Sequence, residues 1–521
     1  MADPVVATRY GAVRGRESDG VATFLGIPYA APPTLAGRFS PPTRPPAWSG
    51  LRLATSVGPI APQPESLLGG YVPGDPRRQD EDCLSLNVFT PRCDDARRPV
   101  LVFIHGGAFL IGTGGSIMYR AETLARREVV VVTFNYRLGA LGFLAHPNLA
   151  SGRDGMFANW GVLDQLAALR FVRDHITDFG GDPGNVTIFG ESAGAMSAAN
   201  LLAVPSAKGL FRRAILQSGA ALALGESDAA KTAERFAAAL GFDRVDRDLL
   251  ATVPIEDVLA AQATLFGDLG LGASMPFQPV IDGVLLPRHP EVTLATGGGN
   301  AEALLVGTNR DEFRFFTIGR RHLDDLADDD LGRYVASYLP PGRADEADIV
   351  VKQYREIASG RGENPSSRRL FESIASDSVF WAPAVRLATA SSRFRPTFVY
   401  RFDWESPFMG GALGSCHGLE LPFVFGTTTD PFVGLFSGNG PQADKLSETI
   451  QTAWVAFATH GDPGVGGTFG WPRYDETSRS TALLGSEMTD VDAPREPERI
   501  VWESLLGHYG DPMLLIGSAG T

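Results

Sequence analysis

A serine stands between two glycines where the sequence changes from strand-like to helix-like. The β-branched and aromatic run Val186–Phe189 is followed by Gly190-Glu191-Ser192-Ala193-Gly194 and then by the small, apolar stretch Ala193–Leu202. This G-x-S-x-G pattern predicts a sharp strand-to-helix turn that lifts the serine hydroxyl above a sheet. Side chains at the two glycine positions would collide across such a turn. Ser192 is therefore the candidate nucleophile.

A serine hydroxyl needs a base at neutral pH, and His417 is the strongest candidate. It lies in the tight loop Gly414-Ser415-Cys416-His417-Gly418, and the apolar segment Leu419–Phe425 follows as an anchor. His289 and His322 stand beside prolines or charges and are expected at the surface. His460 precedes a Gly-Asp-Pro run and is expected at the end of a helix.

The acid that orients the base is expected after a strand that lies between Ser192 and His417 in the sequence. Ala303–Val306 predicts such a strand, and the loop after it contains Asp311 and Glu312. The pattern alone does not choose between the two carboxylates. The pattern is equally compatible with Asp311 and Glu312 both being solvated charges on a surface loop.

A glycine-rich segment, His105-Gly106-Gly107-Ala108-Phe109, follows the predicted strand Val100–Ile104. An HGGG-type motif at this place supplies backbone N–H groups to a developing oxyanion. His105 itself is expected to be a structural turn residue. Phe109, Leu110 and Phe313–Phe316 are candidates for pocket walls and equally for ordinary core.

The elements that position these groups alternate between strand and helix. Apolar, β-branched runs predict strands, and the spacing of apolar residues in Val162–Phe179 predicts an amphipathic helix. We therefore expect an α/β fold with a central, mostly parallel sheet flanked by helices. No domain boundary is evident, so residues 1–521 are expected to form one domain, with helical insertions near 228–266 and 323–393. The predicted strands are Val100–Ile104, Val129–Phe134, Val186–Phe189, Arg213–Gln217, Ala303–Val306 and Thr397–Phe402.

Composition excludes several classes of partner. The net charge of −14 argues against non-specific binding to nucleic acid or to an anionic membrane surface. No apolar run is long enough to predict a transmembrane helix. Three cysteines are too few for a disulfide scaffold and favour a cytoplasmic protein with reduced thiols. No HExxH or paired CxxC spacing indicates a metal, and no cofactor is expected.

Several segments spread over nearly the whole chain resemble the type-B carboxylesterase family, which includes bacterial para-nitrobenzyl esterases, animal carboxylesterases and cholinesterases. The resemblance implies an α/β-hydrolase fold. The segments are Phe24–Ala30, Glu81–Asn87, Asn135–Gly139, Phe179–Pro183, Phe189–Ala195, Gln217–Gly219, Arg310–Glu312 and Trp471-Pro472.

This resemblance also assigns roles. It implies Ser192 as nucleophile, Glu312 as acid and His417 as base, with Asp311 as a structural neighbour. The implied oxyanion donors are the N–H groups of Gly107, Ala108 and Ala193. Glu81 and Arg137 match a structural ion pair of the family, and Glu191 is similar to a residue near the active-site floor.

The expected activity is hydrolysis of small carboxylic esters through an acyl-enzyme intermediate, by a bacterial, cytoplasmic monomer or weak homo-oligomer. The same triad also serves amides, carbamates and specialised natural-product esters, so these remain alternatives. A triacylglycerol lipase would need an exposed apolar lid, which the insertions do not obviously supply. A non-catalytic binding protein on the same fold is the alternative from another class.

Overall fold

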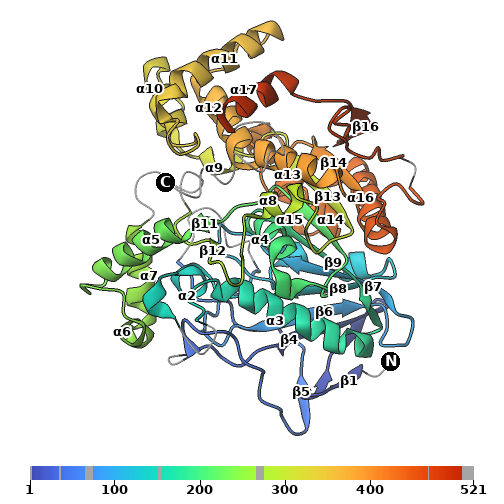
Figure 1. Ribbon diagram of the computed structural model, residues 1–521. Helices are drawn as coiled ribbons and strands as arrows, with labels where there is room; N and C mark the ends of the chain where they lie inside the picture. The colour runs from blue at the N-terminus through green and yellow to red at the C-terminus, as the bar shows by residue number, and fades with distance from the viewer. Residues whose placement is uncertain are drawn as a thin grey trace.

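The computed structural model describes residues 3–34, 37–64, 74–150, 155–265, 275–467 and 469–506, and its centre is a twisted, 11-stranded sheet (Figure 1). The middle of the sheet is parallel and its two margins are antiparallel. In spatial order the strands are β16 (Met488–Val491), β15 (Thr481–Leu484), β14 (Thr397–Phe402), β13 (Ala303–Asn309), β10 (Arg213–Gln217), β9 (Gly181–Glu191), β7 (Arg98–Ile104), β8 (Val130–Phe134), β6 (Ser85–Thr90), β4 (Val21–Pro28) and β3 (Arg16–Ser18).

Helices cover both faces of this sheet, and two small sheets lie beside it. The small sheets are formed by β1 (Val5–Thr8), β2 (Gly11–Arg14) and β5 (Leu51–Leu53), and by β11 (Leu224–Gly225) and β12 (Val280–Ile281). The helices are α1 (Glu122–Ala125), α2 (Gly139–Phe143), α3 (Trp160–His175), α4 (Ala193–Ala203), α5 (Glu226–Ala239), α6 (Arg247–Thr252), α7 (Ile255–Thr264), α8 (Pro290–Ala295), α9 (Arg314–Thr317), α10 (Asp328–Ala336), α11 (Ala347–Gly360), α12 (Ser367–Ser376), α13 (Ala382–Ser392), α14 (Leu421–Phe425), α15 (Pro431–Ser437), α16 (Pro441–His460) and α17 (Glu496–Leu506).

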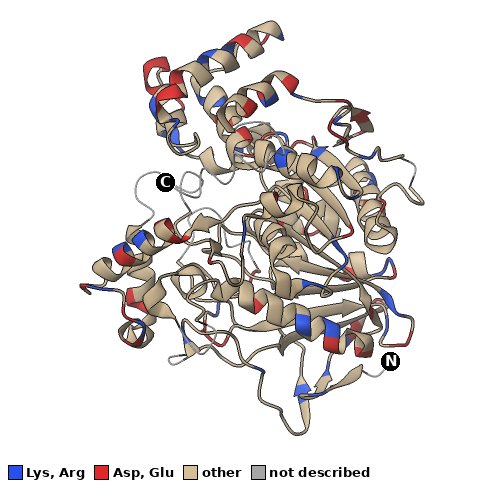
Figure 2. Ribbon diagram, viewed as in Figure 1, with Lys and Arg blue, Asp and Glu red and all other residues tan. Residues whose placement is uncertain are grey.

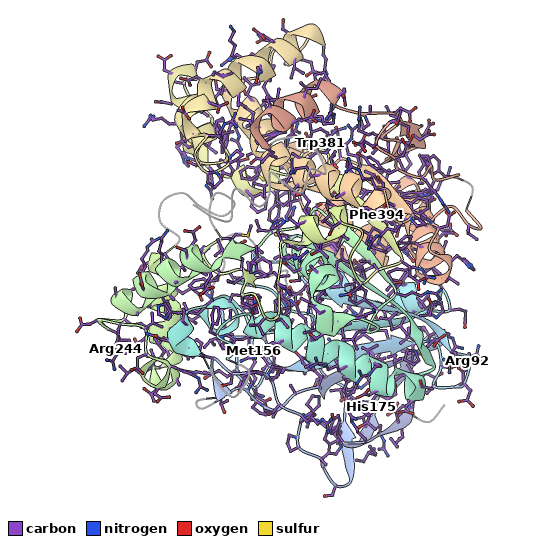
Figure 3. All side chains as sticks on the ribbon, in the orientation of Figure 1. Arg92, Met156, His175, Arg244, Trp381 and Phe394 are labelled. Atoms are coloured by element: carbon purple, nitrogen blue, oxygen red, sulfur yellow. The ribbon has the colours of Figure 1, made fainter. Side chains whose placement is uncertain are left out.

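Alternating residues of the central strands belong to two different cores. In β7, Val100, Val102 and Ile104 pack into the core that includes α3 and α4, whereas Leu101 and Phe103 pack into the core that includes α14 and α16. Successive side chains of a strand point to opposite faces, so a continuous apolar run is required when both faces are covered. Side chains fill the space between the sheet and these helices (Figure 3).

The mostly parallel α/β architecture expected from the sequence is therefore confirmed. The predicted strands all exist, although β7, β9 and β13 are longer than expected. The segments near 228–266 and 323–393 carry helices α5–α7 and α10–α13, with residue 266 outside the described residues. That the chain is one domain stays a prediction. Within the described residues no helix has both the length and the apolar character to cross a bilayer.

Charged side chains concentrate on the peripheral helices. Figure 2 shows acidic and basic residues together on α10, α11, α12 and α17, whereas β4, β6, β8, β13 and β15 of the central sheet contain no charged residue. Charges on a buried parallel sheet would have to be desolvated, so they gather where helices meet solvent.

One buried ion pair fixes the loop after β8 to α3. Arg137 and Asp164 are 3% and 0% exposed, and two guanidinium nitrogens each lie 2.7 Å from a carboxylate oxygen. Glu81 instead pairs with Arg38, at 2.5 Å. The predicted Glu81–Arg137 ion pair is therefore wrong, because each residue has a nearer partner of opposite charge.

Replacement of Arg137 by Met should lower the free energy of unfolding by about 3–5 kcal/mol, because Asp164 would stay buried without its counter-charge. Urea denaturation measures the loss. The matched control is Arg212→Met, which removes an ion pair whose side chains are 48% and 62% exposed, and it should cost less than about 1 kcal/mol. Equal losses in the two variants would contradict the assignment.

Candidate active site

The serine lies at a strained turn between β9 and α4. Ser192 has φ 56° and ψ −126°, a backbone conformation that non-glycine residues rarely adopt. A Cβ at Gly190 would overlap the backbone of Gly194, and a Cβ at Gly194 would overlap the carbonyl of Ile104. The expectation that both positions need glycine is thus met in the structure, and the turn brings Ser192 to the edge of the sheet.

The topology explains why the other groups reach the same edge. Ile104 of β7 pairs with Gly190, and Gln217 of β10 pairs with both Glu191 and Gly307. The parallel strands therefore end at the same edge, and the segments that follow them meet there. The glycine-rich segment follows β7, Ser192 follows β9, and Glu312 follows β13.

The predicted base and acid are in contact. Nδ1 of His417 lies 2.7 Å from Oε2 of Glu312, and the backbone N–H of His417 donates to the Glu312 carbonyl at 3.3 Å. Oε1 of Glu312 accepts from the backbone N–H of Asn309 at 2.7 Å, and the side chain is almost completely buried. Both oxygens of this carboxylate are therefore committed, which fixes the orientation of the imidazole.

Asp311 has a different set of partners. Its Oδ1 lies 2.8 Å from Arg314, and its Oδ2 accepts from Arg310 and, at 3.0 Å, from the backbone N–H of Ser415. Its own N–H donates to the Ser415 carbonyl at 2.8 Å. These contacts favour Glu312 over Asp311 as the partner of the imidazole, and they make Asp311 a clamp on the loop that carries His417.

A second glutamate lies on the other side of the imidazole. Oε1 of Glu191 is 3.0 Å from Nε2 of His417. Burial opposes a charged imidazole, but the charges and hydrogen bonds of Glu191 and Glu312 outweigh it and raise the pKa of His417 well above its usual 6.5. The sequence placed Glu191 near the site without a definite role. Its contact with the imidazole depends on the turn geometry.

A third acidic side chain, Glu420, lies fully buried below this pair. It accepts hydrogen bonds from Asn309 at 2.7 Å and from Gln217 at 3.1 Å. Burial, together with the charges of Glu191 and Glu312, raises the pKa of Glu420 to about 8. No local pattern pointed to this residue, because only the fold brings it close to Glu191 and Glu312.

The glycine-rich segment packs directly against the serine. A Cβ at Gly106 would approach the Ser192 Cβ to 3.0 Å. Gly107 and Ala108 have φ values of 107° and 55°, so the backbone turns sharply here. The predicted donor residue Ala193 is the buried first residue of α4. His105 stacks on Tyr136 with ring centroids 4.5 Å apart, as a structural residue would.

Ser192, His417, Gly107 and Ala108 line one apolar cavity of about 440 Å³. Of the aromatic candidates, Phe315 and Phe316 line it, whereas Phe109 and Phe313 are buried in the core. Sequence reasoning missed Phe380, from the single π-helical turn Asp377–Trp381, whose ring centroid lies 4.5 Å from that of His417. It also missed further wall residues, namely Met118, Tyr119, Met196, Phe408, Phe432 and Phe436.

The remaining histidines lie elsewhere in the fold. His322 is exposed and His460 is the last residue of α16, as their neighbours predict. The expectation that His289 is a surface residue is wrong. It is partly buried, and burial together with the charge of Arg386 lowers its pKa to about 4.

Comparison with known proteins gives consistent results. The model of the carboxylesterase family matches residues 2–501. The chain belongs to the carboxylesterase family. It is 41% identical to the para-nitrobenzyl esterase of Bacillus subtilis, over 96% of this chain and 98% of that protein. It is 35% identical to carboxylesterase 1D of Rattus norvegicus, over 96% and 93%. A solved structure of a PNB esterase superimposes with a TM-score of 0.84, at 39% identity over 96% of this chain and 99% of that one.

This carboxylesterase is thus a serine hydrolase that acts on carboxylic esters, and the expected α/β-hydrolase fold is confirmed. Its apolar cavity with a few convergent polar groups is typical of a small-molecule site.

The carboxylesterase variant Glu191→Gln should shift the acid limb of the pH profile of kcat/KM to lower pH. A base must be neutral to accept a proton, so with His417 as the predicted base kcat/KM is expected to rise as pH passes upward through the pKa of His417. Loss of the Glu191 charge removes a cause of the raised pKa, and the imidazole then becomes neutral at lower pH. The control Glu302→Gln removes a 62% exposed charge far from the imidazole and should leave the limb in place. An acid limb at unchanged pH in Glu191→Gln would contradict the effect of the Glu191 charge on the pKa of His417.

Proposed function

We propose that Ser192, His417 and Glu312 are the catalytic triad of this esterase, and that the backbone N–H groups of Gly107, Ala108 and Ala193 form its oxyanion hole. The observation that carries the proposal is the 2.7 Å contact between Nδ1 of His417 and the buried Glu312 carboxylate. The imidazole of His417 lines the same cavity as Ser192. The family resemblance assigns the same three residues.

In the proposed reaction the Ser192 hydroxyl attacks the ester carbonyl while Nε2 of His417 accepts its proton. Glu312 stabilises the imidazolium and holds its tautomer. The tetrahedral oxyanion is stabilised by the N–H groups of the oxyanion hole, each of which is worth about 2.7–4 kcal/mol in comparable enzymes. His417 then protonates the leaving alkoxide, and water releases the acyl group by the same route.

The walls of the cavity favour apolar esters of short to medium length. Phe315, Phe316 and Phe380 surround the imidazole, and the volume of about 440 Å³ suits a small ester. Amides, carbamates and specialised natural-product esters remain alternatives, because the same triad attacks their carbonyls.

Longer apolar esters are a second candidate, favoured by the mouth of the cavity. Phe408 and Phe432 line the cavity and are 43% and 52% exposed, and Met409 and Leu435 beside them in sequence are also exposed. These residues lie outside the helical insertions near 228–266 and 323–393. An exposed apolar rim of this kind contacts chains that extend beyond the cavity.

We also propose that the enzyme works in a bacterial cytoplasm as a monomer or weak homo-oligomer. The para-nitrobenzyl esterase relative is bacterial. The thiols of Cys83, Cys93 and Cys416 are unpaired, as is usual in a reducing compartment.

Ser192→Ala should lower kcat/KM for para-nitrophenyl butyrate by at least about 10⁴-fold, because no other group supplies the attacking oxygen. Initial rates of purified wild type and variant, with thermal melting as the folding control, measure the effect. The wild type should hydrolyse the butyrate faster than a long-chain ester. A folded, active Ser192→Ala variant would overturn the assignment of the nucleophile, and a faster long-chain ester would favour the second candidate.

A comparison of Glu312→Gln with Asp311→Asn separates the two adjacent carboxylates. Glu312→Gln should lower kcat by about 10³–10⁴-fold, since the imidazole loses its counter-charge and its fixed tautomer. Asp311→Asn retains an oxygen that accepts from Ser415 and should lower kcat by less than about tenfold. The reverse order would show that Asp311 is the acid.

A further inference from the structure

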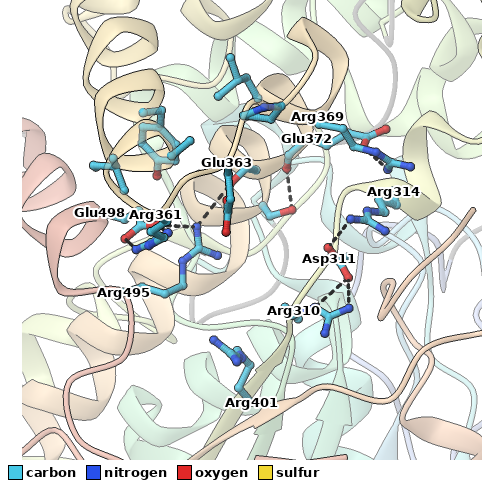
Figure 4. A pocket seen from close by; sticks show the side chains of 17 residues that line it. Arg310, Asp311, Arg314, Arg361, Glu363, Arg369, Glu372, Arg401, Arg495 and Glu498 are labelled. Atoms are coloured by element: carbon cyan, nitrogen blue, oxygen red, sulfur yellow. Dashed lines mark hydrogen bonds and ion pairs between the residues drawn. The ribbon is translucent and has the colours of Figure 1, made fainter.

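A second cavity, of about 630 Å³, is lined in part by Arg310, Asp311 and Arg314, which follow β13 (Figure 4). It is separate from the cavity of Ser192, and no residue lines both. Its walls come from α11, α12 and α17 and from the loop after β13. In Figure 4, Arg361 and Arg495 lie on one side of the space, Arg310 and Arg314 lie opposite, and Arg401 lies below.

Basic side chains outnumber acidic ones in this wall. Six arginines line the cavity, against the four carboxylates of Asp311, Glu363, Glu372 and Glu498. Some of these carboxylates are shared: Asp311 contacts both Arg310 and Arg314, and Glu498 contacts both Arg361 and Arg495. Three further carboxylates, of Asp377, Asp403 and Glu405, pair with these arginines from outside the wall, so the cavity gathers many guanidinium groups without a clear excess of positive charge. Guanidinium N–H groups gathered around one cavity favour an anionic ligand with several acceptor oxygens.

The guanidinium of Arg495 retains unused hydrogen-bonding capacity. Its side chain is 15% exposed, Nη2 lies 2.7 Å from Asp377, and its carbon lies 5.3 Å from the centre of the Trp381 ring. Its Nε is buried and has no hydrogen-bond partner in the described part of the chain. A buried donor without a partner costs free energy, and a ligand oxygen would remove that cost.

A neighbouring arginine, Arg314, lies close to other positive charges. Burial lowers the pKa of Arg314, and the nearby positive charges of Arg369 and Arg310 lower it further against the opposing effect of Asp311 and Glu372. A group whose pKa is lowered in this way gains stability when an anion approaches. Guanidinium groups bind carboxylate and phosphate through paired N–H donors, so these are the ligand groups that match the wall.

The cavity is linked to the ester site through Asp311. This carboxylate is held by Arg310 and Arg314 on the cavity side, and it accepts from the Ser415 N–H, two residues before His417, on the other side. An anion that recruits the two arginines would weaken their hold on Asp311. The Ser415–His417 loop and any anion in the cavity would therefore share Arg310 and Arg314 through Asp311.

We propose that this cavity binds a small organic anion with two or more carboxylate or phosphate groups, and that binding slows ester hydrolysis by loosening the loop that carries His417. The second part rests on the proposed catalytic role of His417. The first part does not.

Binding is tested by isothermal titration calorimetry with citrate and with inorganic pyrophosphate, in NaCl of matched ionic strength. At least one probe should bind with a Kd below about 1 mM. A tighter Kd for citrate would identify carboxylate as the preferred group, and a tighter Kd for pyrophosphate would identify phosphate. Absence of saturable binding of both probes up to about 10 mM would overturn the proposal.

The double variant Arg361→Gln/Arg369→Gln should weaken binding by at least about tenfold, because two donors are lost from the mouth of the cavity. The two side chains are 42% and 40% exposed, and their partners Glu498 and Glu372 each keep another arginine, so the fold should persist. The matched control Arg333→Gln/Arg212→Gln removes the same charge elsewhere on the surface and should bind as the wild type does. Equal weakening in both double variants would show a non-specific charge effect and would overturn the site.

Glu363→Gln removes a negative charge from the wall and should tighten binding about threefold. A folding defect would not produce tighter binding, so this variant keeps the test falsifiable if the arginine variants are unstable. Unchanged or weaker binding by a folded Glu363→Gln protein would count against the site.

The coupling is tested by steady-state hydrolysis of para-nitrophenyl butyrate with the stronger probe. The probe should lower kcat at least about twofold with little change in KM, and the Arg361→Gln/Arg369→Gln variant should not respond. Binding without an effect on kcat would overturn the proposed coupling but not the proposed anion-binding site. Calorimetry with Ser192→Ala shows binding without catalysis, so failure of the proposed triad and failure of the anion site give different results.

Discussion

The close approach of β9, α4 and β7 at the Gly190–Gly194 turn is the constraint on which the rest of the site depends. Ser192 keeps an unfavourable backbone conformation because the flanking strand and helix leave no alternative path for the chain. Gly219 extends the same constraint to the segment after β10, since a Cβ there would approach the Ser192 carbonyl to 2.5 Å. Because the serine is fixed in this way, the site is complete once the segments that follow β7 and β13 lie at the same edge of the sheet.

Buried acidic side chains around the imidazole of His417 are the second feature that organises the site. The imidazole of His417 lies between two carboxylates, Glu312 at Nδ1 and Glu191 at Nε2, and Glu420 lies buried nearby. Several acidic groups in one buried region cannot all be charged at low cost, and the raised pKa of Glu420 reflects this. The arrangement favours a positive charge on the imidazole, which is the charge that the proposed reaction develops there.

Much of this was predictable from the sequence, because the signals were local. The strand-to-helix switch around Ser192, the glycine run after Ile104 and the tight loop at His417 each follow from residue types over a few positions. The choice between Asp311 and Glu312 does not follow from residue types, because the two residues are adjacent in one loop. Only the family resemblance separated them. Phe380 and Glu191 reach the imidazole, and Glu420 comes close to Glu191 and Glu312, through tertiary packing that no local pattern encodes. The errors on His289 and on the Glu81–Arg137 pair have the same origin, since burial and choice of ion partner depend on segments distant in sequence.

The two-sided core has a consequence for how the chain is made. One face of β7, which ends at residue 104, packs against Phe425 of α14 and against α16, which ends at residue 460. During synthesis from the N-terminus, Leu101 and Phe103 therefore lack this part of their cover until most of the chain has left the ribosome. Apolar strand surface exposed for that long is prone to aggregation. The protein is thus expected to depend on chaperones for its yield during translation, and truncations before α16 should accumulate as insoluble material.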